Sequence, residues 1–318
     1  MLDRPYLLLL ATTTSWAGNA IAGRMAAGSV SPMVLTSLRW ALAIGIVLVF
    51  AKPYLERDRE TIRRHWVRLA GLGAVGFAIF NVMLYTALSY TTAMNVALIQ
   101  GGMPAVILLL GFVLFGRRVR ALQIVGLVLS LLGVAVIVLS GEGALGTVGR
   151  GDIIILVGIL VYAGYTIALA YKPPMHWLSS IAVMGGAGFL ASLPFAAWEI
   201  ATGTANWPSD AGDWGIVVYA GVFPSLVAQI CYIRANELIG ANRAGMFTNM
   251  TPVIGTLLAV VVLGEAFRWT HALALVLTLG GIALAEWAAN RGETPDDRVG
   301  GNGESVPGTR DVAATRGT

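Results

Sequence analysis

The most constraining feature of this chain is a series of long apolar stretches that recurs along almost its whole length. A helix needs roughly 20 mostly apolar residues to cross a lipid bilayer, and ten windows of the sequence meet that description. They use nearly everything before residue 290, so no separate soluble domain fits. The expected fold is an all-α integral membrane protein with ten transmembrane helices. The windows are 5–23, 32–51, 68–89, 92–115, 121–140, 152–171, 178–199, 213–235, 244–263 and 270–289.

Composition excludes the soluble alternatives. Hydrophobic residues make up 57% of the chain and charged residues only 12%, whereas a soluble domain carries about 25% charged residues. A membrane barrel would show short alternating segments instead of long apolar runs. The first window lacks the basic start and small-residue cleavage site of a signal peptide, so it is read as a retained helix. Cys231 lies within a window and is expected to be a buried structural residue.

The net charge of +4 is best interpreted as membrane topology. With a cytoplasmic N-terminus, most of the 21 lysine and arginine residues fall on the cytoplasmic side. Only Arg24, Arg150 and Arg268 fall outside, and Arg39 lies within a window. The positive-inside rule therefore places both termini in the cytoplasm, in a multi-pass protein of the cytoplasmic (inner) membrane. Residues 291–318 lack apolar periodicity and are predicted to form a disordered cytoplasmic tail.

Two windows are interrupted at matched positions. Pro104 stands within "NVALIQGGMPAVILLLGFVLFG", and Pro252, 148 residues later, stands within "AGMFTNMTPVIGTLLAVVVLGE". A proline in a helix interior destabilises the helix by about 3 kcal/mol, so its recurrence at a matched position indicates that the break has a role. Together with Gly101 and Gly102, which add backbone freedom, the prolines are predicted to act as hinges. Static bends remain the alternative.

The 148-residue offset divides the chain into two repeats, residues 1–141 and 150–290, each with five windows. At this offset Gly116 matches Gly264, and Gly133 matches Gly281. Because five is odd, the second repeat enters the membrane in the opposite orientation. Inverted repeats with interrupted helices near the midplane are typical of secondary transporters.

Three stretches of the sequence carry a resemblance to a known family: "SPMVLTSLRWALA", "YTALSYTTAMNVALIQGGMPAVILLLGFVLFGRR" and "NELIGANRAGMFTNMTPVIGTLLAVVVLGEAF". With the repeats described above, they resemble the EamA-type transporters of the drug/metabolite transporter superfamily, and the resemblance covers residues 1–290. Within the family, the aromatic-rich interior is most similar to the exporters of aromatic amino acids. The resemblance implies export of a small metabolite through a central cavity. Arg117 departs from the family, because many relatives carry an acid where the second repeat has Glu265.

Polar and aromatic side chains indicate which helices line that cavity, because polar groups are costly in lipid. They gather in windows 5–23, 68–89, 92–115, 152–171, 213–235 and 244–263, so the other four are predicted to be peripheral. Hydroxyls in the peripheral set, such as Ser130, Ser192 and Thr278, are expected to bond to their own helix carbonyls. The candidate substrate-binding residues are Trp16, Asn19, Phe77, Asn81, Tyr85, Asn95, Gln100, Met103, Tyr162, Tyr165, Gln229, Tyr232, Met246 and Asn249.

Each of these residue types also has a structural interpretation. The tyrosines also suit helix packing, the amides suit interhelical hydrogen bonding, and the methionines suit gap filling. The tryptophans near span ends, Trp40 among them, are read as membrane-interface anchors. Arg39 suits either a clamp for a substrate carboxylate or a structural partner of helix-end carbonyls, and the structural role is preferred because its window is classed as peripheral.

The sequence carries no sign of a catalytic or metal-binding site. No acidic residue lies deep in a window, and there is no P-loop, metal-ligand cluster or nucleophile–base set. We therefore expect no enzyme activity, no cofactor or metal, no nucleic-acid partner, and a monomer in the bilayer. Three functions remain open: export of aromatic or large apolar amino acids, efflux of lipophilic cations or other metabolites, and a membrane-embedded sensor or enzyme. The first is preferred.

Overall fold

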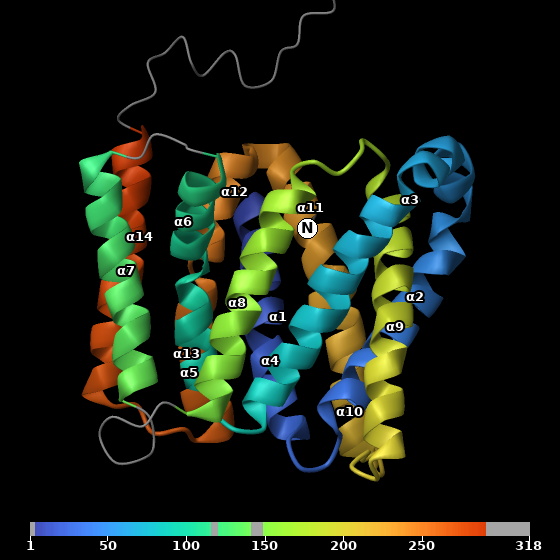
Figure 1. Cartoon of the computed structure of the whole chain (residues 1–318), viewed down its shortest axis with the longest axis horizontal. Coiled ribbons are helices and arrows are strands. Elements are labelled where there is room, and N and C mark those ends of the chain that lie inside the picture. The colour runs from blue at the N-terminus through green and yellow to red at the C-terminus, as the bar shows by residue number, and fades with distance from the viewer. Residues whose placement is uncertain (1–3, 116–119, 141–148, 291–318) are drawn as a thin grey trace, which may run out of the picture.

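The described part of the chain is built from helices. A computed structural model describes residues 4–115, 120–140 and 149–290, and within these ranges no strand is present. The helices stand side by side and run between two opposite faces of the molecule (Figure 1). The predicted tail and the Arg117 position lie outside the described residues. Of Met246, which lies in a helix, only the backbone is described.

The first half of the chain forms five helical units, of which the third and fourth are composite. The third unit contains a short π-helix, and the fourth is interrupted at Gly102. The bounds are α1 Pro5–Ala26, α2 Pro32–Arg57, α3 Arg59–Gly73 with η1 Ala74–Ile79 and α4 Phe80–Leu88, α5 Ala93–Gly101 with α6 Met103–Phe115, and α7 Ala121–Leu139.

The second half repeats this order. Its third unit again contains a π-helix, and its fourth is again interrupted. The bounds are α8 Arg150–Leu169, α9 Trp177–Ala201, α10 Ala211–Val222 with η2 Phe223–Val227 and α11 Ala228–Ile239, α12 Ala241–Thr248 with α13 Thr251–Leu263, and α14 Trp269–Asn290.

The helices confirm an all-helical membrane protein. Within the described residues, eight helical stretches are long and apolar enough to cross a bilayer, and Thr251–Leu263 is a shorter apolar helix. The 22-residue α1 is a further helix, with Thr12, Thr13, Ser15 and Asn19 buried along it. Each of the ten predicted windows falls on helical structure. One difference is that α3 begins at Arg59, well before the predicted window, because its basic first turns are helical too.

Both predicted helix breaks are present. The helix of α5 ends at Gly101 and α6 begins at Met103, so that Pro104 occupies the first turn of a new helix. Likewise α12 ends at Thr248 and α13 begins at Thr251, directly before Pro252. Proline is tolerated there because first-turn N–H groups have no helical acceptor. The two breaks touch, since a Cβ atom added to Gly101 would lie 3.2 Å from the Pro252 ring.

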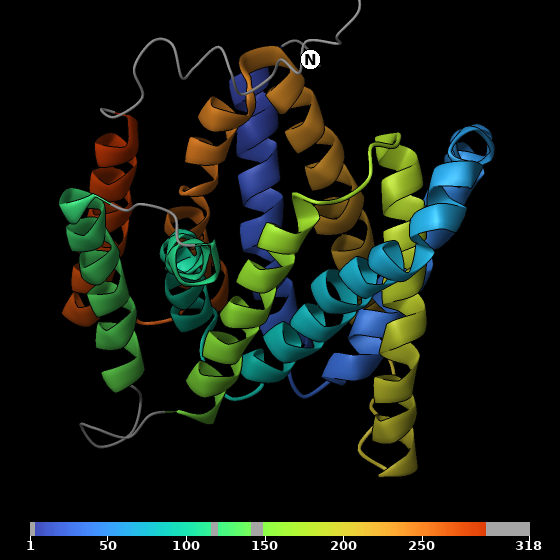
Figure 2. The ribbon, with the colours of Figure 1, turned by 45° about the horizontal axis from the view of Figure 1, so that its top comes forward.

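The outer helices pack in pairs. In both views α7 and α14 lie side by side, while α2 and α9 pack together at the opposite end of the molecule (Figures 1 and 2). Helix α1 lies between the α10–α11 and α12–α13 units (Figure 2). Helices α1, α4, α5, α8, α11 and α13 lie between these two outer pairs (Figure 1).

Small residues bring α7 and α14 into backbone contact. A Cβ atom on Gly126 would lie 2.5 Å from the carbonyl oxygen of Gly281, so neither glycine has room for a side chain. Gly133 packs on Thr278, and Gly281 packs on Ser130, which are equivalent contacts at the 148-residue offset. Such close approach is a common basis of helix association in membranes. The prediction that the Ser130 and Thr278 hydroxyls bond to their own helices is wrong, because neither makes a hydrogen bond among the described residues. Ser192 does bond as predicted, to Phe189.

Candidate functional site

A polar cluster surrounds the guanidinium of Arg39 in the middle of the bundle. Its Nη1 donates to Asn81 Oδ1 at 2.6 Å, to the Tyr85 hydroxyl at 2.7 Å and to Asn19 Oδ1 at 3.2 Å. Its Nε donates to Ser225 Oγ at 2.9 Å. The Tyr85 hydroxyl in turn donates to Asn19 Oδ1. This Arg39 cluster joins α2 to α1, α4 and η2, and so links the two halves of the chain.

The Arg39 cluster is shielded from solvent. Arg39 is 5% exposed, and the other four members are between 2% and 8% exposed. Among the described residues, no carboxylate lies within ion-pair distance of the guanidinium. Helix-end carbonyls were the predicted partners of Arg39, and that prediction is wrong, because side-chain amides and hydroxyls surround the guanidinium. Although α2 is peripheral, its long arginine side chain reaches the centre.

A chain of aromatic rings starts beside the guanidinium. Trp40 stacks on Phe77 with ring centroids 4.5 Å apart. Phe77 contacts Tyr165 at 6.2 Å, Tyr165 contacts Tyr162 at 5.1 Å, and Tyr162 contacts Phe80 at 4.4 Å. These rings come from α2, η1, α8 and α4. They give the site an apolar wall next to a polar one.

Trp40 was predicted to anchor the membrane interface, but it is buried, whereas Trp198, Trp207, Trp214 and Trp287 are exposed as expected.

Two π-helices accept hydrogen bonds from Arg39 and Trp40 at matched positions. Phe77 of η1 and Ser225 of η2 are 148 residues apart, the offset of the two breaks. The Trp40 indole Nε1 donates to the Phe77 carbonyl at 2.6 Å, and Arg39 Nε donates to Ser225. Neighbouring residues of α2 therefore bind equivalent points of the two halves. π-helical turns occur often at functional sites, and sequence reasoning missed both, since only Pro224 in η2 signalled an irregular turn.

The sequence comparisons identify the family. The model of the EamA-like transporter family matches residues 3–139 and again 149–287. The chain belongs to this family. An uncharacterized transporter of Bacillus subtilis, YetK, is 24% identical over 282 residues, covering 87% of this chain and 85% of YetK.

Two further relatives of this EamA-like transporter have named substrates. The aromatic amino acid exporter YddG of Ancylobacter novellus is 26% identical, with 83% of this chain and 91% of YddG covered. The biotin transporter of Escherichia coli is 24% identical, with 92% of this chain and 97% of that protein covered. Several solved structures match, and for one of them, a crystal structure, the TM-score is 0.62 at 25% identity, with 91% of this chain and 99% of that one covered. Because the chain belongs to a transporter family, the predictions that it is a multi-pass membrane transporter and not an enzyme are confirmed.

The structure brings together only some of the predicted site residues. Asn19, Asn81 and Tyr85 belong to the Arg39 cluster, and Phe77, Tyr162 and Tyr165 belong to the ring chain. Trp16 and Tyr232 form a separate pair on α1 and α11, with ring centroids 5.4 Å apart. Gln100 and Met103 are half-buried at the α5–α6 break, and Gln229 is half-buried on α11.

Two other predicted amides lie apart from the cluster. Asn249 donates to Glu286 of α14 at 3.0 Å, close to the α12–α13 break. Asn95 donates to Thr91 at the start of α5. On sequence grounds Arg39 was expected to have a structural role, and Ser225 was not a candidate binding residue. Both belong to the Arg39 cluster. Among the residues that the structure describes, no group of three or more His, Cys, Asp or Glu side chains is placed to hold a metal ion.

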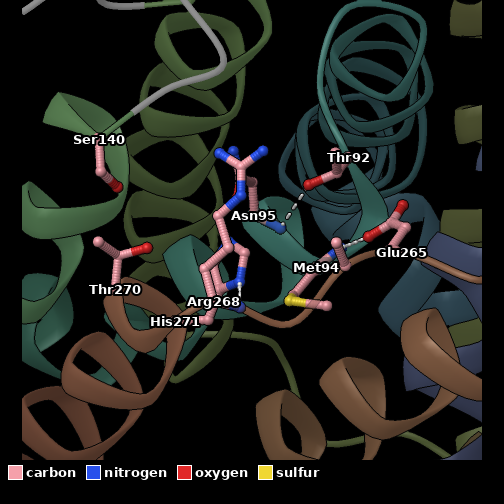
Figure 3. Close-up of a pocket in the computed structure, with 9 residues that line it drawn as sticks. Thr92, Met94, Asn95, Ser140, Glu265, Arg268, Thr270 and His271 are labelled. Atoms are coloured by element: carbon pink, nitrogen blue, oxygen red, sulfur yellow. Dashed lines mark hydrogen bonds between the residues drawn. The ribbon is translucent and has the colours of Figure 1, made fainter. Parts of the chain in front are cut away.

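Asn95 instead lines a small pocket at the face where α5 and α14 begin. Thr92, Glu265, Arg268 and His271 surround it (Figure 3). The Glu265 carboxylate accepts from the backbone N–H groups of Ala93 and Met94, both at 2.8 Å. The pocket's volume of about 70 Å³ has room for only a few water molecules. We therefore treat it as a helix-capping site and place the functional centre at the Arg39 cluster and the ring chain.

Proposed function

We propose that this EamA-like transporter exports amino acids with aromatic or large apolar side chains from the cytoplasm, by alternating access. The observation that carries the proposal is the ring chain beside the Arg39 cluster, at the point where the two halves of the chain meet. Aromatic pairs favour ring contacts by about 0.5–1.5 kcal/mol beyond simple burial. A substrate with an apolar body and a polar end matches a wall of rings next to a wall of hydrogen-bonding groups.

The proposed architecture is a pair of inverted five-helix repeats, residues 1–141 and 150–290, giving ten spans. Positions 148 residues apart support it at three levels: the breaks before Pro104 and Pro252, the π-helices η1 and η2, and the contacts Gly133–Thr278 and Gly281–Ser130. Each repeat has five helical units, so the second enters the membrane with opposite orientation. A single chain then supplies both halves of the pathway, and we propose that it acts as a monomer.

Both termini are proposed to be cytoplasmic, in the inner membrane. The start of α1 lies at the same face of the molecule as the end of α14 (Figure 1). Arg57, Arg59 and Arg120 lie at element ends on that face, whereas Arg24 and Arg150 lie at helix ends on the other. The positive-inside rule then assigns the basic face to the cytoplasm.

The touching breaks support alternation between two states. Gly101 packs on the Pro252 ring, so bending of α5–α6 is coupled sterically to bending of α12–α13. In inverted repeats the same bend closes opposite sides of the membrane, as in other repeat transporters. Gly101, Gly102, Pro104 and Pro252 are the proposed hinge residues.

The names of two relatives support this proposed substrate class. One is an aromatic amino acid exporter and the other a biotin transporter. Aromatic amino acids and biotin share a carboxylate joined to an apolar, ring-bearing body. The ring chain favours the aromatic amino acids, because flat side chains can stack within it.

A counterflow assay with the purified protein in liposomes tests the proposal. Liposomes loaded with unlabelled phenylalanine should accumulate labelled phenylalanine, tryptophan and leucine, while glutamate and lysine should exchange at least about tenfold more slowly, as expected for charged side chains against an apolar wall. Protein-free liposomes provide the baseline. Exchange of a lipophilic cation such as tetraphenylphosphonium, with no exchange of any amino acid, would overturn the proposal and favour cation efflux.

A further inference from the structure

Arg39 is a permanent positive charge, buried without a negative partner among the residues that the structure describes. Arginine keeps its proton at any physiological pH, and Arg39 is 5% exposed. Buried charges in proteins are normally paired with an opposite charge, because leaving water costs several kcal/mol per ion. Only neutral dipoles surround this guanidinium among the described residues. The site is therefore electrostatically incomplete as it stands.

The hydrogen bonds of the guanidinium are unevenly distributed. Nη1 has two hydrogens, yet three acceptors lie within 3.2 Å of it: Asn19, Asn81 and Tyr85. Nε is occupied by Ser225. Nη2 carries two more hydrogens and makes no hydrogen bond within residues 4–115, 120–140 and 149–290. Nε and Nη1 of the guanidinium are therefore bound by the protein, whereas the N–H groups of Nη2 are left to bind a ligand.

We propose that Arg39 binds the carboxylate of the transported substrate, with Asn19, Asn81, Tyr85 and Ser225 as positioning residues that hold the guanidinium in place. The inference rests on the proposed function and deepens it, because it names the substrate class as carboxylates. A carboxylate supplies both the charge that the site lacks and acceptors for Nη2. Guanidinium–carboxylate hydrogen bonds are about twice as strong as neutral ones.

The position of the rings agrees with this assignment. The Arg39 Cζ atom lies 5.4 Å from the centroid of Trp40 and 5.9 Å from that of Tyr85. Trp40 opens the ring chain that continues through Phe77 to Tyr165. A substrate whose carboxylate binds Arg39 would have aromatic surface next to its charged end. An aromatic amine without a carboxylate would meet a like charge there and be rejected.

The alternative is that Arg39 only braces the bundle, since it joins α2 to α1, α4 and η2. The two roles make opposite predictions for Asn19→Asp and Asn81→Asp. Either substitution places a carboxylate beside Nη1, where the amide oxygens now lie at 3.2 and 2.6 Å. A brace would be kept or strengthened by the new ion pair. A substrate site would instead be blocked by an internal competitor.

The experiment measures binding to the full-length protein in lipid nanodiscs with three probes of the same size class. Phenylalanine and 3-phenylpropionate carry a carboxylate, and phenylalaninamide does not. We expect both carboxylates to bind the wild type at least about tenfold more tightly than the amide, as expected for charge-assisted hydrogen bonds. Asn19→Asp and Asn81→Asp should remove that preference without lowering the thermal unfolding midpoint. Asn206→Asp, the same change in an exposed loop, should keep the preference.

The outcomes separate this inference from the proposed function. If phenylalanine and its amide bind the wild type equally, or if Asn19→Asp keeps the preference, Arg39 is a brace and the inference is overturned, whether or not amino acids are transported. If phenylalanine is neither bound nor exchanged, but 3-phenylpropionate binds and loses binding in Asn19→Asp, the carboxylate site stands and amino-acid export falls. If no carboxylate binds, both fall.

Discussion

At the scale of single residues, two tyrosines have different roles, one in the Arg39 cluster and one in the ring chain. The Tyr85 hydroxyl accepts from Arg39 and donates to Asn19, and its residue is 2% exposed. The Tyr162 hydroxyl makes no hydrogen bond among the described residues, while its ring contacts Phe80 and Tyr165. The oxygen therefore matters at Tyr85 and the ring matters at Tyr162. Sequence alone treats both tyrosines alike.

Replacing each tyrosine with phenylalanine tests this difference. Tyr85→Phe leaves buried polar partners without their hydrogen bonds and should lower the free energy of unfolding by about 1–3 kcal/mol. Tyr162→Phe should change it by no more than about 0.5 kcal/mol and keep transport, whereas Tyr162→Ala should reduce transport. Thermal unfolding in detergent and the counterflow assay provide the readouts. Equal destabilisation by the two phenylalanine variants would contradict the assignment.

At the scale of elements, carboxylates at helix ends tie helices together. Glu199, near the end of α9, accepts from the N–H groups of Met33 and Val34 at the start of α2. Asp58, after the end of α2, accepts from the N–H of His176 at the start of α9. Each helix of this pair thus caps the other. Glu265 caps α5 in the same way, and negative charge there is favoured by the helix dipole.

Glu265→Gln should weaken the capped start of α5. The amide keeps one oxygen, but it loses the charge and the second acceptor for Ala93 and Met94, so we expect a loss of about 1–2 kcal/mol of stability. Glu237→Gln is the matched control, because Glu237 pairs with Arg234 on the exposed surface, where ion pairs contribute about 0–1 kcal/mol. Thermal unfolding compares the two. A larger loss at Glu237 would show that the cap contributes little.

The broken helices are elements with a proposed motion. Pro104→Ala or Pro252→Ala restores a backbone donor and should straighten one helix of the touching pair. Because the repeats are proposed to be inverted, the two variants should shift the conformational equilibrium in opposite senses. A cysteine at position 92, introduced after Cys231→Ser, should become more reactive in one variant and less reactive in the other. Transport should fall in both variants, since alternation needs the free energies of the two states to lie within a few kcal/mol of each other. Unchanged labelling and transport would make the prolines static bends.

At the scale of the whole molecule, the sequence predicts the helices well and their cross-connections poorly. Apolar length placed all ten windows on helix, and the matched prolines located both breaks, because these features depend on local composition. Arg39 was not predicted to be at the centre because it belongs to a peripheral helix. A count of polar residues in each helix does not show that its long side chain can reach the neighbouring helices. Trp40 near a span end looked like an interface anchor until its stacking on Phe77 was known. The π-helices depend on tertiary packing, for example of Gly76 against Tyr165.

The orientation of the molecule in the membrane is the last testable expectation. Asn206 and Ser31 are hydrogen-bonded neighbours on one face, while Arg59 begins α3 on the opposite face. The positive-inside rule assigns the Arg59 face to the cytoplasm, because Arg57 and Arg120 also lie at element ends on that face. A cysteine at position 206 should therefore react with a membrane-impermeant maleimide in intact cells, and a cysteine at position 59 should react only after the cells are opened. Labelling of position 59 in intact cells, with position 206 protected, would contradict the proposed orientation and place the Arg59 face of the protein outside the cell.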